Sequence, residues 1–206
     1  MNIKRSLNTF FAAVVMAVVF TACSFGNKPA GSEKTGLKAT ASSIEILGDG
    51  RIKAGINETF TESYYDVNEL LAMVNGELAD YNAAHGAESI TLGDYSLENG
   101  VMYMSFVFKS ADDYNNYMPD ELYLGTVQGA YDKGYDFNRS LYKASASENS
   151  IGKKDLLERG SDRIAVLTGT SSIKLPDKID YYSQGMTMTD KYTVTPDANG
   201  IYFVLY

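Results

Sequence analysis

Alternating apolar and polar positions predict two β-hairpins early in the chain. Residues 43–47 and 51–60 alternate in this way on either side of Gly48–Gly50, whose glycines suit a tight turn. Residues 89–97 and 101–109 repeat the pattern around an Asn-Gly turn. The apolar side chains of the last strand share one face, which we expect to lie in the core: Met102, Met104, Phe106 and Phe108.

Between these hairpins, the period of the pattern changes from two to about 3.6 residues, which predicts a helix over 66–84. Asp66 is placed to cap its first turn, with Glu69 three residues later as in a capping box, and Gly86 is placed to end it. The apolar stripe of this helix consists of Leu70, Leu71, Val74, Leu78 and Tyr81.

The second half of the chain predicts shorter elements. We expect short helices over 110–118, 125–133 and 153–159, a strand over 121–124, and a loop over 145–152. From residue 163 onward the pattern is all β, with candidate strands at 163–168, 171–175, 178–183, 191–195 and 200–206. The last of these is apolar on both faces, which is typical of a strand buried on both sides.

These elements together predict an α+β fold. Hairpins with interposed helices, followed by a run of strands, favour a largely antiparallel sheet with one long helix and two or three short ones. The pattern shows no internal repeat and no second domain boundary, so residues 43–206 are expected to form one globular domain.

The N-terminal segment has a different pattern, typical of an export signal. Lys4 and Arg5 precede an uninterrupted apolar run over 10–20, and a small residue, Ala22, precedes Cys23. Eleven apolar residues in a helix rise about 16 Å, roughly half the hydrocarbon core of a bilayer. The run alone is therefore a poor membrane span.

The ending Phe20-Thr21-Ala22-Cys23 resembles the lipobox of bacterial lipoproteins. Ala22 matches that family, whereas Phe20 and Thr21 depart from its usual residues. The resemblance implies a diacylglycerol on the Cys23 thiol and removal of residues 1–22. It also implies a location on the extracytoplasmic face of the cell membrane. Plain secretion and an uncleaved anchor remain the alternatives.

Residues 23–42 are small, polar and aperiodic, and they are expected to form a flexible tether. With this tether, the chain resembles small lipoproteins of Gram-positive bacteria, and that resemblance implies no activity. Cys23 is also the only cysteine, so no disulfide can support an exported fold, which must rely on its core.

The charge of the chain excludes some partners. The formal net charge is −8, and residues 54–108 contain no Lys or Arg. We therefore expect no nucleic-acid partner, because the phosphate backbone binds through basic side chains. The acidic stretch contrasts with a mildly basic one over 139–178, a division that suggests either a partner-binding face or an ordinary solvated surface. A Ca²⁺ site is a further alternative, although no segment has EF-hand spacing.

Catalytic chemistry has little support in the pattern. The single histidine, His85, lies at the end of the predicted long helix, where the helix dipole favours its charge. Three S-x-x-K matches lack the companion motifs of β-lactamases. Paired carboxylates such as Asp112–Asp113 and Asp120–Glu121 keep a hydrolase open as the third hypothesis. We expect a protein without enzymatic activity and without a cofactor.

Tyrosine is the residue in excess, with 16 in the chain and no tryptophan. Tyrosine provides rigid amphipathic contact area, which suits recognition of proteins or sugars, but it is also an ordinary strand residue. The first hypothesis is a lipid-anchored module that binds or scaffolds an envelope protein, and the second is capture of a cell-wall glycan or a small solute. The candidate binding surface is Tyr64, Tyr65, Tyr114, Tyr117, Tyr181 and Tyr182.

Overall fold

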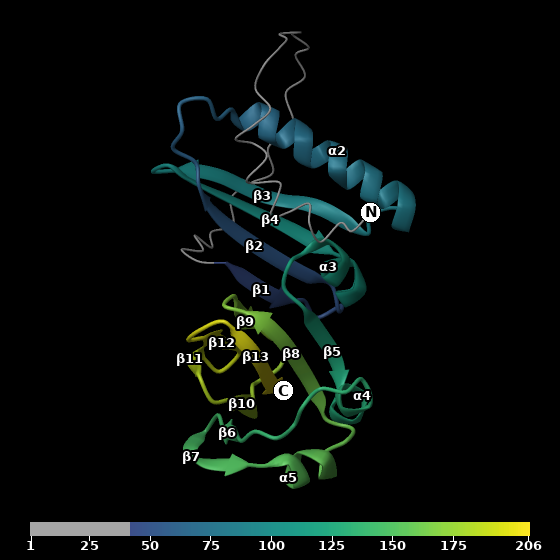
Figure 1. Cartoon of the computed structure of the whole chain (residues 1–206), viewed down its shortest axis with the longest axis vertical. Coiled ribbons are helices and arrows are strands. Elements are labelled where there is room, and N and C mark those ends of the chain that lie inside the picture. The colour runs from purple at the N-terminus through teal and green to yellow at the C-terminus, as the bar shows by residue number, and fades with distance from the viewer. Residues whose placement is uncertain (1–41) are drawn as a thin grey trace.

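The computed structural model describes residues 42–206, which form an α+β structure dominated by two sheets. The structure is elongated, with the N-terminal strands and the long helix at one end and the C-terminal half at the other (Figure 1). The predicted signal segment, Cys23 and all of the predicted tether except Ser42 lie outside the described residues.

Both predicted N-terminal hairpins are confirmed. The strands β1 (Ser43–Ile46) and β2 (Ile52–Thr59) pair antiparallel, as do β3 (Ile90–Glu98) and β4 (Val101–Phe108). Asn99 and Gly100 have φ values of 52° and 73° at the second turn, the left-handed conformation that an Asn-Gly hairpin requires. β2 also pairs with β4, so the two hairpins form one continuous four-stranded unit.

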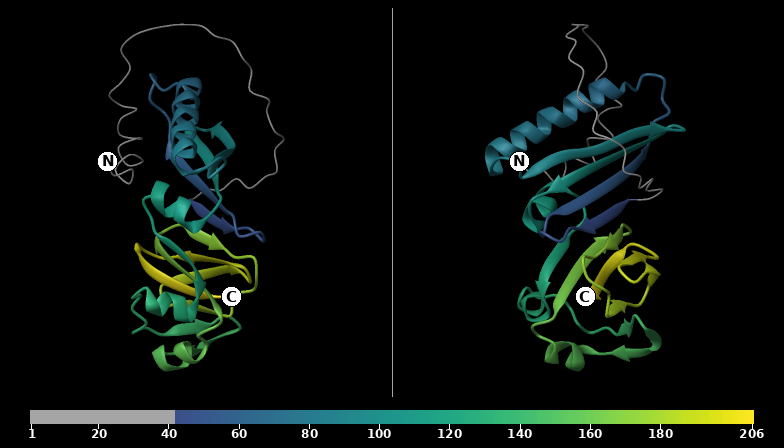
Figure 2. Two further views of the ribbon diagram at one scale, coloured as in Figure 1. Left: turned by 90° about the vertical axis from the view of Figure 1, so that its right-hand side faces the viewer. Right: turned by 180° about the vertical axis from the view of Figure 1, so that it is seen from behind.

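The predicted long helix is α2 (Val67–His85). The Asp66 carboxylate accepts hydrogen bonds from the backbone N–H groups of Asn68 and Glu69, and Gly86 ends the helix with a φ of 114°. α2 lies across one face of the hairpin sheet, above β3 and β4 (Figures 1 and 2). The buried side chains of α2 are the predicted stripe: Leu70, Leu71, Val74, Leu78 and Tyr81.

The shorter elements agree with the prediction except over 141–151, where the structure has two strands that were not predicted. The observed elements are α3 (Ala111–Tyr117), β5 (Leu122–Thr126), α4 (Val127–Asp132) and α5 (Lys153–Glu158). The predicted loop over 145–152 is wrong, because β7 (Ala146–Ile151) occupies it and pairs with β6 (Leu141–Lys143). β7 is a mostly exposed edge strand, so its sequence has no apolar alternation that would reveal it.

The C-terminal strands divide between the two sheets. They are β8 (Arg163–Gly169), β9 (Ser172–Lys174), β10 (Tyr181–Ser183), β11 (Met186–Asp190), β12 (Thr193–Pro196) and β13 (Gly200–Leu205). β11 is an addition to the predicted strands, and its side chains after Met186 are mostly exposed and polar. The sheet orders are β11-β12-β9-β1-β2-β4-β3 and β5-β8-β13-β10-β6-β7.

The chain therefore passes from one sheet to the other several times after β8. Every described strand pairing is antiparallel except one, the parallel pairing of β1 with β9, which aligns Ile44 with Ile173. This pairing attaches the C-terminal strands β9, β12 and β11 to the N-terminal hairpins. Residues far apart in the sequence thus share the seven-stranded sheet.

The last strand, β13, is buried on both faces, as its apolar sequence predicts. Tyr202 and Val204 belong to the core cluster that also contains α2 and the hairpin strands. Phe203 and Leu205 point to the other face, into a second cluster beneath α4 and α5. The six-stranded sheet therefore separates two cores and contributes to both.

Among residues 42–206, no helix combines the length and the apolar character that crossing a membrane requires.

The burial of Phe203 in the middle of β13, compared with the exposed Ile201 near its start, predicts a large stability difference between two residues on the same face of that strand. Phe203 is fully buried, whereas Ile201 is 46% exposed. We expect Phe203→Ala to lower the free energy of unfolding by about 3–5 kcal/mol, because it leaves a cavity in the second core. Ile201→Ala should change it by about 0.5 kcal/mol or less. Urea denaturation followed by circular dichroism measures both, and equal losses would contradict this account of the strand.

Candidate functional site

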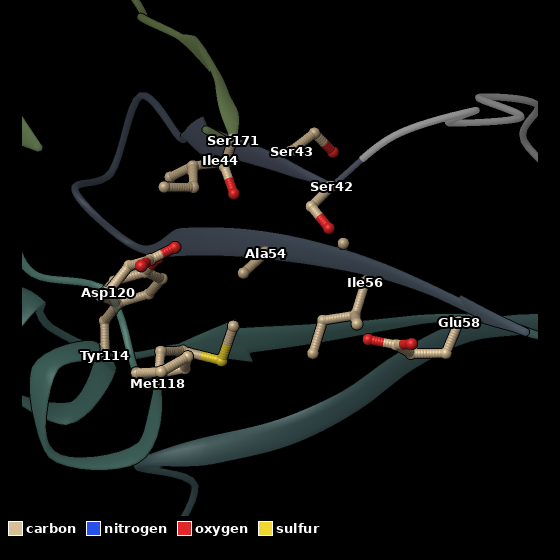
Figure 3. Close-up of a pocket in the computed structure, with 12 residues that line it drawn as sticks. Ser42, Ser43, Ile44, Ala54, Ile56, Glu58, Tyr114, Met118, Asp120 and Ser171 are labelled. Carbon is tan, nitrogen blue, oxygen red and sulfur yellow. The ribbon is translucent and has the colours of Figure 1, made fainter. Parts of the chain in front are cut away.

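A groove of about 180 Å³ lies where the two sheets meet. Its floor comes from β1 and β2, one wall from the end of α3, and its rim from the segment that joins β8 to β9 (Figure 3). It is lined by Ser42, Ser43, Ile44, Ala54, Gly55, Ile56, Glu58, Tyr114, Met118, Pro119, Asp120 and Ser171.

The floor of the groove is one face of β2. Ile52, Ala54, Ile56 and Glu58 alternate along the strand, so their side chains point to the same side of the sheet. The α2 helix covers this face over β3 and β4, and the groove lies beside it over β1 and β2 (Figures 1 and 3). Apolar side chains thus form the middle of the floor, and the Glu58 carboxylate lies at one end (Figure 3).

The opposite end of the groove holds Asp120, which a rigid connection positions. Pro119 cannot continue α3, so the chain turns there toward β5. The Asn115 side chain spans this turn, donating to the Leu122 carbonyl at 2.8 Å and accepting from the Leu122 N–H at 2.7 Å. The Glu121 N–H donates to Thr168 Oγ1 at 2.7 Å. These bonds hold Asp120 between α3 and the end of β8.

Asp120 also depends on a glycine in β8. Gly169 has a φ of 92°, and a Cβ built there would lie 2.5 Å from Asp120 Oδ2. Only glycine therefore allows the carboxylate this close approach. Asp120 is half-buried, and no hydrogen bond or ion pair from residues 42–206 reaches its carboxylate. Burial consequently raises its pKa above the usual range of an aspartate.

Tyr114 provides the second polar group at this end. Its ring packs edge-on against Phe108 with 5.3 Å between ring centroids, and the residue is 1% exposed. Its hydroxyl makes no hydrogen bond within the part of the chain that the structure describes. Burial and the nearby Asp120 charge both raise the pKa of Tyr114, so it is a neutral phenol that can donate or accept.

The predicted tyrosine surface is not present as one patch. Tyr114, Tyr117 and Tyr181 are core residues, at 1%, 4% and 8% exposure, because their rings fill the space between helices and sheets. Tyr182 lies half-buried beside Tyr181 on β10, in the C-terminal half of the molecule away from α2 (Figure 1).

Tyr64 and Tyr65 precede α2, and of the six tyrosines Tyr64 is the most exposed, at 44%. Tyr65 packs on Phe60 with 4.7 Å between centroids and meets the edge of Tyr64 at 5.0 Å. These two residues lie on the N-terminal half of the molecule, whereas Tyr181 and Tyr182 lie on the six-stranded sheet. Tyr114 is the member of the predicted set that lines the groove.

The remaining candidates for chemistry lie away from the groove. His85 is in the last turn of α2, as predicted, where its ring stacks on Tyr81 and its Nδ1 lies 3.0 Å from the Tyr81 carbonyl oxygen. Asp113 accepts a hydrogen bond from the Tyr81 hydroxyl at 3.1 Å and does not line the cavity. Within residues 42–206, no three His, Cys, Asp or Glu side chains gather into a possible metal site.

The sequence pattern did not identify two groove residues, Glu58 and Asp120, as site residues. Glu58 was only part of the acidic stretch over 54–108, and Asp120 was only part of the pair Asp120–Glu121. Glu58 continues the row of Ile52, Ala54 and Ile56 at the same spacing, and an acid at a core-facing position is a signal that sequence reasoning can use. Asp120 has no such signal, because the residue that it meets, Gly169, is distant in sequence.

Comparisons of the chain with protein-family models, with curated proteins and with solved structures found no match.

The unpaired carboxylate predicts that Asp120→Asn stabilises the protein. Its folded-state pKa is raised, so the destabilisation by its charge is present above that pKa and disappears below the unfolded value of about 3.9. Tyr114 and Glu58 are the other titratable groups of the groove, and neither supplies a cation. We expect the melting temperature to rise at pH 7 by roughly 1–3 °C and to be unchanged at pH 3.

The matched control is Asp80→Asn on the exposed face of α2. Its melting temperature should differ from that of the unsubstituted protein by less than about 1 °C at either pH. A lower melting temperature for Asp120→Asn at pH 7 would show that the charge stabilises the fold, contrary to this prediction. Differential scanning calorimetry measures all three proteins.

Proposed function

We propose that this protein is a lipid-anchored, extracytoplasmic binding protein that captures a small solute in the groove without changing it chemically. The observation that carries the proposal is the pair of unpartnered polar groups, Asp120 and Tyr114, at one end of an apolar floor. Small-molecule sites typically combine an apolar lining with a few polar groups that fix the orientation of the ligand. Buried polar groups are otherwise nearly always hydrogen-bonded.

The anchor part of the proposal depends on Cys23 and the residues before it. An apolar run that ends in a small residue and a lone cysteine supports lipidation of that cysteine. Ser42, the last residue of the predicted tether, lines the groove, and its carbonyl accepts a hydrogen bond from the Ser172 N–H at 3.2 Å. The chain from Cys23 therefore joins the described structure beside the groove.

Capture suits the groove better than catalysis does. Its polar groups are carboxylates and hydroxyls, and the histidine that would serve as a base for a serine nucleophile lies on α2. Capture of a glycan by a row of tyrosines has less support, because three of the six candidate rings are buried. Of the two ligands in the second hypothesis, a cell-wall glycan and a small solute, the geometry favours a small solute that fits between Asp120 and Glu58.

The second candidate function, binding or scaffolding of an envelope protein, has one specific observation in its favour. Tyr95, Leu97 and Val101 are each more than 40% exposed near the turn between β3 and β4, at the edge of the seven-stranded sheet. The segment that carries Tyr64 joins the same end, because the Phe60 N–H donates to the Gly100 carbonyl at 2.7 Å. Exposed apolar groups on an edge strand suit a protein partner.

One experiment separates the two candidates. Methyl groups of Ile44, Ala54 and Ile56 report on the groove, and those of Leu97 and Val101 report on the hairpin end. The detergent-solubilised full chain, with these methyl groups labelled, is titrated with envelope extract divided into small solutes and proteins. We expect the small-solute fraction to shift the groove signals, and Ala54→Leu to reduce those shifts by filling the floor.

Shifts confined to the hairpin end, caused by the protein fraction, would replace groove capture with the scaffolding function. Unchanged groove signals with every small-solute fraction would overturn the capture proposal. The melting temperature of Ala54→Leu shows whether that variant is folded, and the titration of the unsubstituted chain decides the question even where it is not.

The anchor has its own prediction. Cys23→Ala removes the thiol that receives the lipid, so we expect most of the protein to leave the membrane fraction or to keep residues 1–22. Ser24→Ala, one residue later, is the matched control and should remain anchored. Membrane flotation with mass spectrometry of the N-terminus measures both, and equal membrane retention of the two variants would exclude lipid anchoring at Cys23.

A further inference from the structure

The charge of the groove restricts the ligand that it can hold. Its two acidic side chains are Asp120 at one end and Glu58 at the other, and no Lys, Arg or His is among its lining residues (Figure 3). The stretch that supplies most of the floor, residues 54–108, contains no Lys or Arg. An anionic solute would therefore meet only repulsion, whereas a cationic one would be attracted from either end.

The Asp120 end has the features of a site for an ammonium group. A half-buried carboxylate without a partner is costly to the fold, and a bound cation offsets that cost. Tyr114 is a second and independent indication of a ligand, because its side chain is almost completely buried and its hydroxyl has no partner among the described residues. The Ser171 hydroxyl points into the groove from the segment between β8 and β9 (Figure 3).

These three side chains match the donors of a primary ammonium. An ammonium carries three N–H donors and no acceptor. A carboxylate oxygen, a phenol oxygen and a serine oxygen are three acceptors of different geometry around one space. Hydrogen bonds in which a partner is ionised are stronger than neutral ones, so Asp120 would contribute most to the affinity.

The middle of the groove suits a chain of methylene groups. Ile44, Ala54 and Ile56 form the floor and Met118 the wall, and none of these side chains offers a hydrogen-bond donor. Ala54 and Glu58 are four residues apart on an extended strand, so this part of the floor is about 13 Å long. Glu58, at the far end, is exposed and can reach a second cation.

We propose that the groove binds a small aliphatic diamine or polyamine, with one terminal ammonium at Asp120, Tyr114 and Ser171 and the other at Glu58. This proposal depends on the capture function above and names the chemical class of its ligand. The methylene stem covers the apolar floor, and the two carboxylates set the requirement for positive charge at both ends.

Aliphatic probes of similar length test the charge requirement. Diaminooctane and octanediol share a stem of eight methylene groups and differ only in their end groups, whereas octanoate has one anionic end and one methyl end. Each is titrated into the detergent-solubilised full chain by calorimetry at pH 7. We expect diaminooctane to bind at least about 10-fold more tightly than octanediol, and octanoate not to bind. Methyl signals of Ile44, Ala54 and Ile56 show whether binding occurs in the groove.

Three variants test the placement of the two ammonium groups. Asp120→Asn should weaken diaminooctane binding at least about 10-fold, because it removes the charged acceptor of the half-buried site. Glu58→Gln should weaken it about 2- to 5-fold, because exposed ion pairs contribute little. Asp80→Asn, on α2, should leave it unchanged. An equal effect of all three variants would show diffuse attraction to an acidic surface and overturn the proposal. Displacement of diaminooctane by Mg²⁺, a cation of the same charge, at an equal concentration would do the same.

The remaining outcomes separate this proposal from the capture function. Groove shifts caused equally by octanediol or octanoate would overturn the choice of a cation and leave capture in place. Tighter binding of a lysine-containing peptide than of diaminooctane would overturn the choice of a small molecule. If neither the probes nor any small-solute fraction shifts the groove signals, both the ligand class and the capture function are wrong.

Discussion

The rest of the structure depends on the antiparallel pairing of β8 with β13. Six residue pairs join the strands, from Gly169 and Gly200 at one end to Ile164 and Leu205 at the other. Alternate side chains of this pair enter the two different cores, so a one-residue slip would exchange every buried contact on both faces. This requirement sets the register of the central ladder of the six-stranded sheet, against which β5 and β10 then pair.

The groove is a consequence of how the chain leaves this ladder. At the end of β8 the chain crosses to the other sheet and becomes β9, which pairs in parallel with β1. The α2 helix covers the hairpin sheet over β3 and β4 (Figures 1 and 2), whereas the end of α3, the residues after it and Ser171 border the corresponding face of β1 and β2. The space that remains is the groove, and the glycine at the end of β8 admits the Asp120 carboxylate into its wall.

The polar groups of the groove are best understood as a cost that the fold carries for binding. Elsewhere in the described structure, half-buried acids have partners: Asp94 pairs with Lys53 at 2.8 Å, and Asp113 bonds to Ser110 at 2.6 Å. Asp120 and Tyr114 lack such partners, although the same core supplies abundant apolar neighbours. Sites that bind ligands commonly retain unsatisfied groups of this kind, because the ligand completes their hydrogen bonds.

The sequence by itself determined the longer elements that bury one face, whereas the three-residue strand β6 was missed although Leu141 is buried. The period of the apolar residues identified both hairpins and α2, and the two-sided apolar pattern of β13 predicted its burial. Exposed strands such as β7 and β11 have no such pattern and were missed. Only the tertiary structure decided which tyrosines are buried and which acids meet, because Asp120 is adjacent to Gly169 and near β2 through contacts between segments distant in sequence. Local patterns record which side of an element is buried, whereas a groove depends on how separate elements pack.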